Sequence, residues 1–305
     1  MKSLTITATL LSTITFIAQA EINVVASVKP VHSLVSAVME GIGVPDLIVK
    51  GAASPHTYAL KPSQAEQIEK ADLVFWMGHS LETFLEKPLE ALGTKAMVVE
   101  LMDSEGLKKL KMREGGGFDE HEHDEHDEHD EHDEHDEHDE HSKESHDDHG
   151  HGEFDVHVWL DPENAKVMAN EIMEALKKVD PGNAKRYETN TKKVVLKLNQ
   201  LVAEISAELS SVKGKGFIVF HDAYQYFEER FGLKAVGSIT VSPEVVPGVK
   251  RIKELKTKIK ELNALCVFSE PQFKPKLVTT VLEGTQARTG VLDPLGASIQ
   301  HGPEL

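Results

Sequence analysis

Histidine is the residue type with the most chemical potential in this 305-residue chain, and its distribution is uneven. Eleven of the 17 histidines lie in one insert, residues 118–151, which also holds 18 Asp and Glu but a single Lys. The insert therefore carries all but one unit of the net charge of −18, and the rest of the chain is nearly neutral. A body without strong charge does not indicate a nucleic-acid partner, and we predict none.

The insert repeats the triplet His-Asp-Glu from His123 to His141. Imidazole and carboxylate groups both bind zinc. A period of three does not match the 3.6 residues of a helical turn, and like charges would crowd helical neighbours, so we expect a disordered loop that binds several zinc ions locally and weakly. A repeat expansion without a role is the alternative. The predicted weak sites are His121, His123, His126, His129, His132, His135, His138, His141, His146, His149 and His151.

Outside the insert, three histidines occupy similar positions. His56 follows the apolar run 46–49, His157 follows the insert, and His221 ends the run GFIVF. If such runs are parallel strands, their carboxyl ends meet at the edge where α/β proteins bind ligands. Each histidine alone is compatible with a structural role, but three converging neutral imidazoles would form a zinc site. For His32 and His79 we expect structural roles.

The elements that must position these histidines alternate along the chain. Short apolar runs read as buried strands and amphipathic stretches as helices, which is typical of α/β folds with parallel sheets. The predicted strands are 22–28, 46–49, 72–78, 96–101, 156–160, 216–220, 233–239, 264–270 and 289–293. The predicted helices are 62–71, 81–92, one that begins at Asp161-Pro162, 224–231, 249–262 and 275–282. The alternation predicts two α/β lobes.

One long helix is predicted between the lobes. Residues 184–211 contain no Gly or Pro and repeat apolar residues at helical spacing, which predicts an amphipathic helix of about 40 Å. We expect it to bridge two lobes of a monomer, and a coiled-coil dimer helix is the alternative. The predicted organisation is an N-terminal lobe over 21–182, a linking helix over 183–212 and a C-terminal lobe over 213–305.

The first 20 residues predict export. Lys2, an apolar stretch and Ala18-Gln19-Ala20 are typical of a secretory signal peptide cleaved after Ala20. A signal anchor is the alternative, and no other segment has the length of about 18 apolar residues that predicts a membrane span. Cys266 is the single cysteine, so its thiol is either buried or lacks its partner.

Nine segments of the chain carry a wider resemblance. They are SVKPVHSLV, GAASPHTYALKPSQ, ADLVFWMGHSLE, the acidic insert, DVHVWLDPENA, GKGFIVFHDAYQYFEERFGL, SPEVVPGVKRI, CVFSEPQF and LDPLG, within residues 22–300. In these segments the chain resembles the zinc-binding periplasmic receptors of bacterial ABC importers, the ZnuA-type proteins of the TroA-like metal-receptor group. The resemblance implies two α/β lobes bridged by one long helix, a metal cleft between them, a periplasmic location, Zn²⁺ as the transported ligand and an inner-membrane permease as partner.

The resemblance also implies the zinc ligands. They are His56, His157 and His221, with Asp293 or a water molecule as the fourth. The chain departs from the family pattern at Pro55, where some zinc receptors have Glu. Family members usually continue past LDPLG with a helix that carries a second Cys, so we expect this chain to be truncated at Leu305.

The three histidines also bear on which metal is bound and on whether the protein is a receptor or an enzyme. Three imidazoles favour zinc over manganese, because zinc stands higher in the affinity order for nitrogen donors. Three histidines and an open position also occur in zinc hydrolases, but the sequence contains no HExxH motif. We therefore expect a receptor and not an enzyme, with a secreted zinc-sequestering or adhesive protein as a further alternative. Asp155 and Asp222 are expected to support or cap the ligands.

Overall fold

The computed structural model describes residues 22–113, 118, 153–240, 243, 247–261 and 266–303. The predicted signal peptide and the weak metal sites of the insert lie outside the described residues. In the described part of the chain, no helix combines the length and the apolar character that a membrane span requires.

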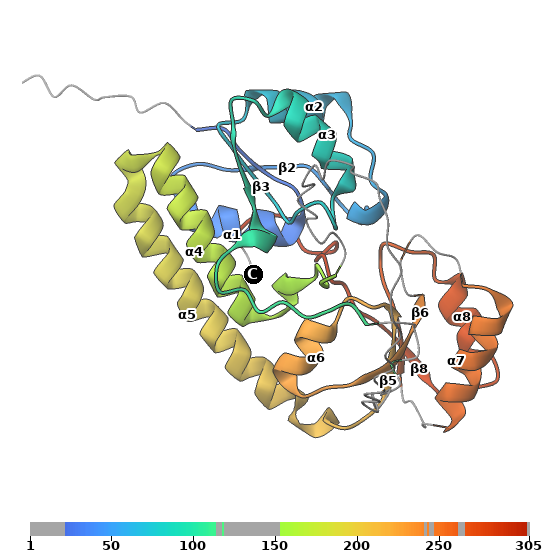
Figure 1. Ribbon diagram of the computed structural model, residues 1–305. Helices are drawn as coiled ribbons and strands as arrows, with labels where there is room; N and C mark the ends of the chain where they lie inside the picture. The colour runs from blue at the N-terminus through green and yellow to red at the C-terminus, as the bar shows by residue number, and fades with distance from the viewer. Residues whose placement is uncertain are drawn as a thin grey trace, which may run out of the picture.

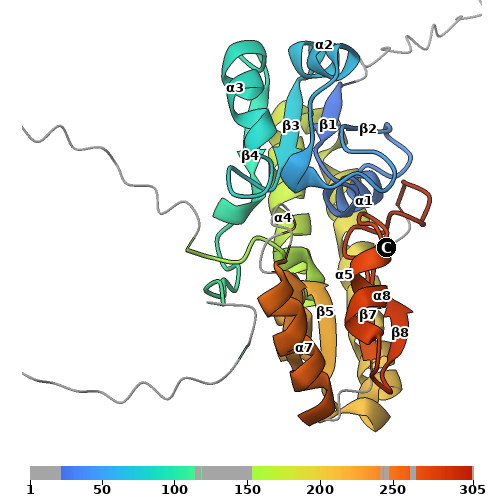
Figure 2. The same ribbon diagram turned by 90° about the vertical axis from the view of Figure 1, so that its right-hand side faces the viewer.

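The N-terminal lobe (Figure 1) is built on a four-stranded parallel sheet with strand order β2-β1-β3-β4, whose strands are labelled in Figure 2. Every residue of β1 and β3 is buried, as expected where helices cover both faces of a parallel sheet. The strands are β1 (Val24–Ala26), β2 (Asp46–Leu47), β3 (Leu73–Trp76) and β4 (Met97–Glu100), and the helices between them are α1 (Lys29–Val38), α2 (Pro62–Lys70) and α3 (Thr83–Leu92).

The C-terminal lobe repeats this design with a second four-stranded parallel sheet of order β6-β5-β7-β8. Its buried residues form separate, smaller apolar clusters. The strands are β5 (Phe217–His221), β6 (Ala235–Thr240), β7 (Cys266–Ser269) and β8 (Arg288–Val291), and the helices are α6 (Gln225–Phe231), α7 (Val249–Glu261) and α8 (Lys276–Leu282). The two sheets confirm the predicted α/β class.

A pair of long helices, α4 (Pro162–Val179) and α5 (Ala184–Glu208), lies along one side of the molecule (Figures 1 and 2). α5 begins beside the N-terminal sheet and ends below the C-terminal one (Figure 1). Its buried Asn190 donates to the carbonyl oxygens of Val38 and Glu40, which fixes it to the end of α1. The predicted bridging helix is therefore confirmed.

The segment 156–160 is not the strand that its apolar residues predicted. Val158–Leu160 form a 3-10 turn, and His157 is the residue before it. The cause is local: the carboxylate of Asp155 accepts the backbone N–H of His157 at 3.0 Å, and this side-chain hydrogen bond competes with strand pairing. The apolar residues Val158 and Trp159 are buried nonetheless.

Candidate metal site

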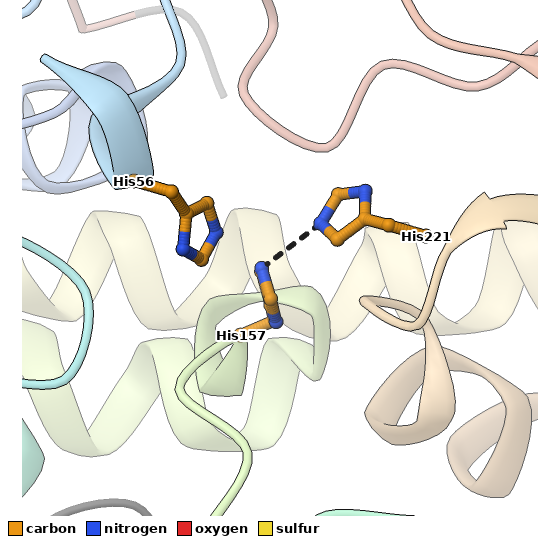
Figure 3. Close-up of side chains that lie close together, drawn as sticks. All are labelled: His56, His157 and His221. Atoms are coloured by element: carbon orange, nitrogen blue, oxygen red, sulfur yellow. Dashed lines mark hydrogen bonds between the residues drawn. The ribbon is translucent and has the colours of Figure 1, made fainter. Parts of the chain in front are cut away.

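Three histidines from separate parts of the chain meet between the lobes (Figure 3). One ring nitrogen from each of His56, His157 and His221 lies within 4.8 Å of the others. The Nε2 atoms of His157 and His221 are 3.3 Å apart, and the ring centroids of the three pairs are separated by 5.2 to 5.9 Å. Imidazoles in such an arrangement can all donate to one cation.

Each histidine is held by a different local structure. His56 lies in a 3-10 turn (Pro55–Thr57) that follows β2, and its buried neighbour Pro55 stands at the first position of the turn. His157 precedes the 3-10 turn that leads into α4. His221 is the last residue of β5, so its ring emerges at the carboxyl edge of the second sheet. The N-terminal lobe thus provides two rings and the C-terminal lobe one.

Two buried carboxylates orient two of the rings. The Nδ1 atom of His157 lies 2.6 Å from Oδ1 of Asp155, and the Nδ1 atom of His221 lies 2.8 Å from the carboxylate of Glu270. When Nδ1–H donates to a carboxylate, Nε2 keeps its lone pair for a metal, and the ring becomes a stronger donor. The predicted supporting role of Asp155 is thus consistent with its contacts, whereas Asp222 pairs with Arg113.

The electrostatics of the rings differ between the lobes. Burial, followed by the nearby rings of His157 and His221, lowers the pKa of His56 to about 2. Burial also acts to lower the pKa of His221, but the Glu270 carboxylate outweighs it, so the pKa of His221 is raised. A bound cation would displace any proton on Nε2 of His221 and use the lone pairs of the neutral rings.

The cavity between the rings has a volume of about 10 Å³, which suits a small ion and leaves no room for an organic ligand. Besides the histidines, its lining includes Leu81, Phe273 and Leu295. These apolar walls exclude water and strengthen the interaction between nitrogen donors and a cation. The donor set and the size both fit a single transition-metal ion.

Asp293, the other predicted ligand, is not brought to the three rings. Its carboxylate accepts hydrogen bonds from Nε2 of Gln272 at 3.1 Å and from the backbone N–H of Ser298 at 3.2 Å. Burial acts to raise the pKa of Asp293, but hydrogen bonds, first from the backbone N–H of Ala297 and then from Gln272, outweigh it and lower the pKa. In the part of the chain that the structure describes, the only group of mutually close metal-binding side chains consists of the three histidines. Asp293 therefore stabilises its own loop in this structure.

The remaining described histidines stay apart from this group. Nε2 of His32 lies 2.9 Å from the carbonyl oxygen of Pro45, and Nδ1 lies 3.3 Å from the hydroxyl of Ser36, so both nitrogens are engaged within the fold. His79 packs edge-on against Trp76, and His301 contacts the ring of His32. The structural roles predicted for His32 and His79 agree with these contacts.

Glu270 is the functional residue that the sequence interpretation missed. It directly follows β7, and β7 pairs with β5, whose last residue is His221. An acid at the carboxyl end of the neighbouring parallel strand must lie near that histidine. The SEP segment at 269–271 was therefore a usable signal.

The two α/β lobes and the three convergent histidines between them are typical of a two-lobed metal receptor. The model of the family described as "Zinc-uptake complex component A periplasmic" matches residues 24–304, and the chain belongs to this family.

Two similar proteins carry the name of a zinc uptake component. The high-affinity zinc uptake system protein ZnuA of Brucella abortus (strain 2308) is 60% identical over 288 residues, which cover 92% of this chain and 86% of the relative. The protein of the same name from Yersinia pestis is 37% identical, over 90% of this chain and 84% of that one.

Solved structures share the fold. The structure described as "Crystal structure of ZnuA" has a TM-score of 0.73 at 24% identity and covers 92% of this chain and 93% of its own. A mutant of the laminin-binding adhesin Lmb from Streptococcus agalactiae has a TM-score of 0.71 at 26% identity, with 91% of each chain covered.

Proposed function

We propose that this protein is the periplasmic zinc receptor of an ABC importer, in which His56, His157 and His221 capture Zn²⁺ and release it to an inner-membrane permease. Membership of the zinc-uptake family supports the transport role. The observation that carries the site assignment is the convergence of three imidazole nitrogens within 4.8 Å of one another. The predicted signal peptide, residues 1–20, supports a periplasmic location.

The chemistry of the donors favours zinc as cargo. Zn²⁺ accepts tetrahedral coordination by three imidazoles and a fourth small ligand, and it stands above Mn²⁺ in affinity for nitrogen donors. Because Asp293 is engaged elsewhere, we propose water as the fourth ligand. The carboxylates of Asp155 and Glu270 keep Nε2 of their histidines available to the ion.

A zinc hydrolase is less compatible with this geometry. A hydrolase needs space for substrate beside the metal-bound water, and the cavity of about 10 Å³ holds little more than the ion. The likeness to a laminin-binding adhesin leaves a second, adhesive role as the alternative. We favour transport, because the relative at 60% identity carries a zinc-uptake name over most of both chains.

The proposal is tested by metal analysis and by growth. Protein isolated from the periplasm should contain tightly held zinc that survives dialysis, and the gene should restore growth under zinc chelation to cells that lack their own receptor. Restoration should require a cognate permease and should disappear with His221→Ala. Growth rescue without a permease, or purified protein that retains no zinc, would contradict the transport role.

A further inference from the structure

The described residues that flank the acidic insert lie close to His157 and to the end of β5. The residues before and after the insert pair with each other: the N–H of Met112 donates to the carbonyl oxygen of Glu153 at 3.0 Å, and that of Asp155 donates to the carbonyl oxygen of Leu110 at 2.8 Å. The segment before the insert therefore runs beside the segment after it, and the latter reaches His157 two residues after Asp155. We name these described residues, 108–113 and 153–155, the insert root.

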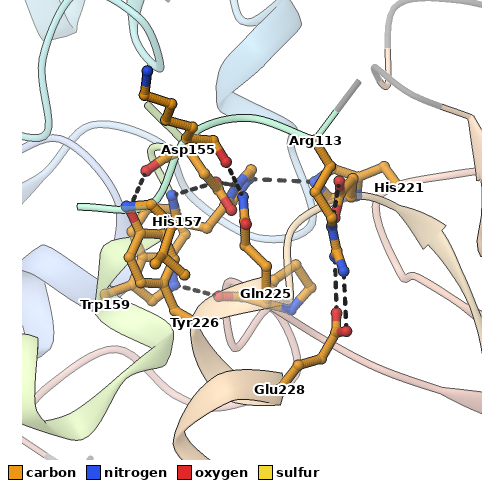
Figure 4. Close-up of polar contacts among 12 residues, drawn as sticks. Arg113, Asp155, His157, Trp159, His221, Gln225, Tyr226 and Glu228 are labelled. Carbon is orange, nitrogen blue, oxygen red and sulfur yellow. Dashed lines mark hydrogen bonds and ion pairs between the residues drawn. The ribbon is translucent and has the colours of Figure 1, made fainter. Parts of the chain in front are cut away.

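The insert root is joined to the C-terminal lobe by polar contacts with helix α6 (Figure 4). The hydroxyl of Tyr226 accepts the backbone N–H of Leu110 and donates to the carbonyl oxygen of Asp155, both at 2.8 Å. Nε2 of Gln225 donates to the carbonyl oxygen of Lys111 at 3.2 Å. The root is thus a joint between the lobes on the side of the zinc site.

Arg113 makes the strongest contacts of this joint. Its guanidinium donates from Nε to the carboxylate of Asp222 at 2.9 Å and from both terminal nitrogens to Glu228, at 3.1 and 2.9 Å. Both carboxylates are almost fully buried, and Phe118 covers the guanidinium with its ring centroid 3.8 Å away. Charge-assisted, forked hydrogen bonds of this kind fix geometry more strongly than single neutral ones.

The position of Asp222 gives the contact its consequence. Asp222 directly follows His221 at the end of β5, and Glu228 lies on α6 and also accepts the backbone N–H of Ala235, the first residue of β6, at 2.8 Å. One guanidinium from the N-terminal lobe therefore holds the chain end that presents the C-terminal lobe's zinc ligand. Glu270 acts on the ring of His221, whereas Arg113 acts on its backbone position.

We propose that Arg113 is a positioning residue for zinc: through Asp222 and Glu228 it holds the end of β5 so that Nε2 of His221 meets Nε2 of His157 across the lobe boundary. This role rests on the proposed zinc-binding function. Arg113 belongs to the insert root, so its contacts also connect the insert root to the residues proposed to hold the ion.

Zinc release from the full-length protein tests the role. After weakly held zinc has been removed, an excess of chelator reports the dissociation rate of the tight site. Arg113→Met should raise this rate about 10-fold or more, the effect typical of residues that orient metal ligands. The visible spectrum of bound Co²⁺ should change as well, because displacement of His221 alters the coordination, and a loss of fold stability alone would leave that spectrum as it is.

Arg230 provides a matched control at the same lobe boundary. It belongs to α6 and forms forked hydrogen bonds with buried Asp161, at 2.6 and 2.7 Å, and Asp161 is not adjacent in sequence to a proposed zinc ligand. Arg230→Met should change the zinc dissociation rate by no more than about 2-fold and leave the Co²⁺ spectrum unaltered. Equal effects of the two replacements, or an unchanged rate in Arg113→Met, would overturn the proposal.

If Arg113→Met does not fold, a triple variant can test the proposal instead. Arg113→Met combined with Asp222→Asn and Glu228→Gln removes the buried charges together, which restores stability when burial of unpaired charge is the only defect. We expect this variant to fold but to release zinc rapidly. Zinc release at the wild-type rate would show that Arg113 merely neutralises two acids. Failure of the wild-type protein itself to bind zinc would refute the proposed function instead.

Discussion

His56 and His221, the proposed zinc ligands at the ends of β2 and β5, lie in opposite electrostatic settings. On the N-terminal side, burial and the adjacent imidazoles lower the pKa of His56 to about 2, so this ring is neutral at any physiological pH. On the C-terminal side, Glu270 outweighs burial and raises the pKa of His221, so this ring carries a proton more readily when no metal is bound. The difference places competition between protons and zinc on the His221 side of the site.

The contrast also affects the stability of the metal-free protein. His221, with a raised pKa in the folded state, contributes stability that is fully present below its unfolded pKa of about 6.5 and is lost as pH rises through the folded value. His56, with a lowered pKa, acts in the other direction: below about pH 6.5 the unfolded chain takes up a proton that the folded protein refuses, so stability falls. Metal binding removes both effects, because it requires neutral rings.

The largest expected effect is the loss of the tight zinc site on removal of any of the three rings. His56→Ala, His157→Ala and His221→Ala should each weaken zinc affinity by more than about 100-fold, since loss of a direct ligand exceeds the 10- to 100-fold cost of losing a residue that orients one. Competition with a chromophoric chelator measures this. His32→Ala is the matched control: it removes another buried histidine and should lower the melting temperature while affinity stays within about 2-fold. Comparable affinity losses in all four variants would refute the ligand assignment.

A second expected effect is a pH dependence of zinc affinity that originates at His221. Affinity should rise with pH until the pH exceeds the raised pKa of His221, because zinc must displace its proton. His56 should add nothing to this dependence above pH 5, since its pKa is about 2. Isothermal titration in buffers of different ionisation enthalpy counts the protons released. If zinc binding released no proton from His221 at pH 6.5, the ordinary pKa of histidine, the contrast between His56 and His221 would be wrong.

Glu270→Gln tests the cause of the contrast, because loss of the carboxylate should lower the pKa of His221 toward the behaviour of His56. The amide oxygen still accepts from Nδ1 of His221, but the negative charge is gone, so zinc affinity above the pKa of His221 should fall by about 10-fold and the pH dependence should move to lower pH. Asp155→Asn, which alters the equivalent contact of His157, should reduce affinity similarly with a smaller displacement of the pH profile. Chelator competition at several pH values separates these outcomes.

His221→Glu tests whether this position also selects the metal. Exchange of an imidazole for a carboxylate replaces a nitrogen donor by an oxygen donor, which suits Mn²⁺ better than the original ring does. The ratio of zinc to manganese affinity should therefore decrease in the variant, as competition titrations of both ions would reveal. A ratio equal to that of the wild-type protein would argue that His221 does not touch the ion.

Local hydrophobic patterns predicted much of this architecture, and they failed where a side-chain hydrogen bond or a distant residue decides. The alternation of strands and helices, and the position of His221 at a strand's carboxyl end, follow from hydrophobic periodicity. The turn at His157 does not, because a hydrogen bond from the backbone N–H of His157 to the Asp155 carboxylate overrides an apolar pattern that favours a strand. The partners Glu270 and Arg113 are 49 and 109 residues away from His221 and Asp222, and only the folded sheets bring them together.

The smallest expected effect on the tight site belongs to removal of the insert. Deletion of residues 119–151 takes away eleven histidines but leaves His56, His157, His221 and their carboxylates in place, so tight-site affinity should change by less than about 2-fold and its pH profile should stay the same.

The number of zinc ions bound at neutral pH should nevertheless fall by several, because the predicted weak sites lie in the deleted segment. In the full-length protein this additional capacity should fade below about pH 6.5, where unperturbed histidines become protonated. Zinc counting by equilibrium dialysis at pH 7.5 and pH 5.5 separates the two classes of site. Equal stoichiometry for both proteins at pH 7.5 would remove the case for zinc capture by the insert, and loss of the tight site on deletion would mean that the insert belongs to that site.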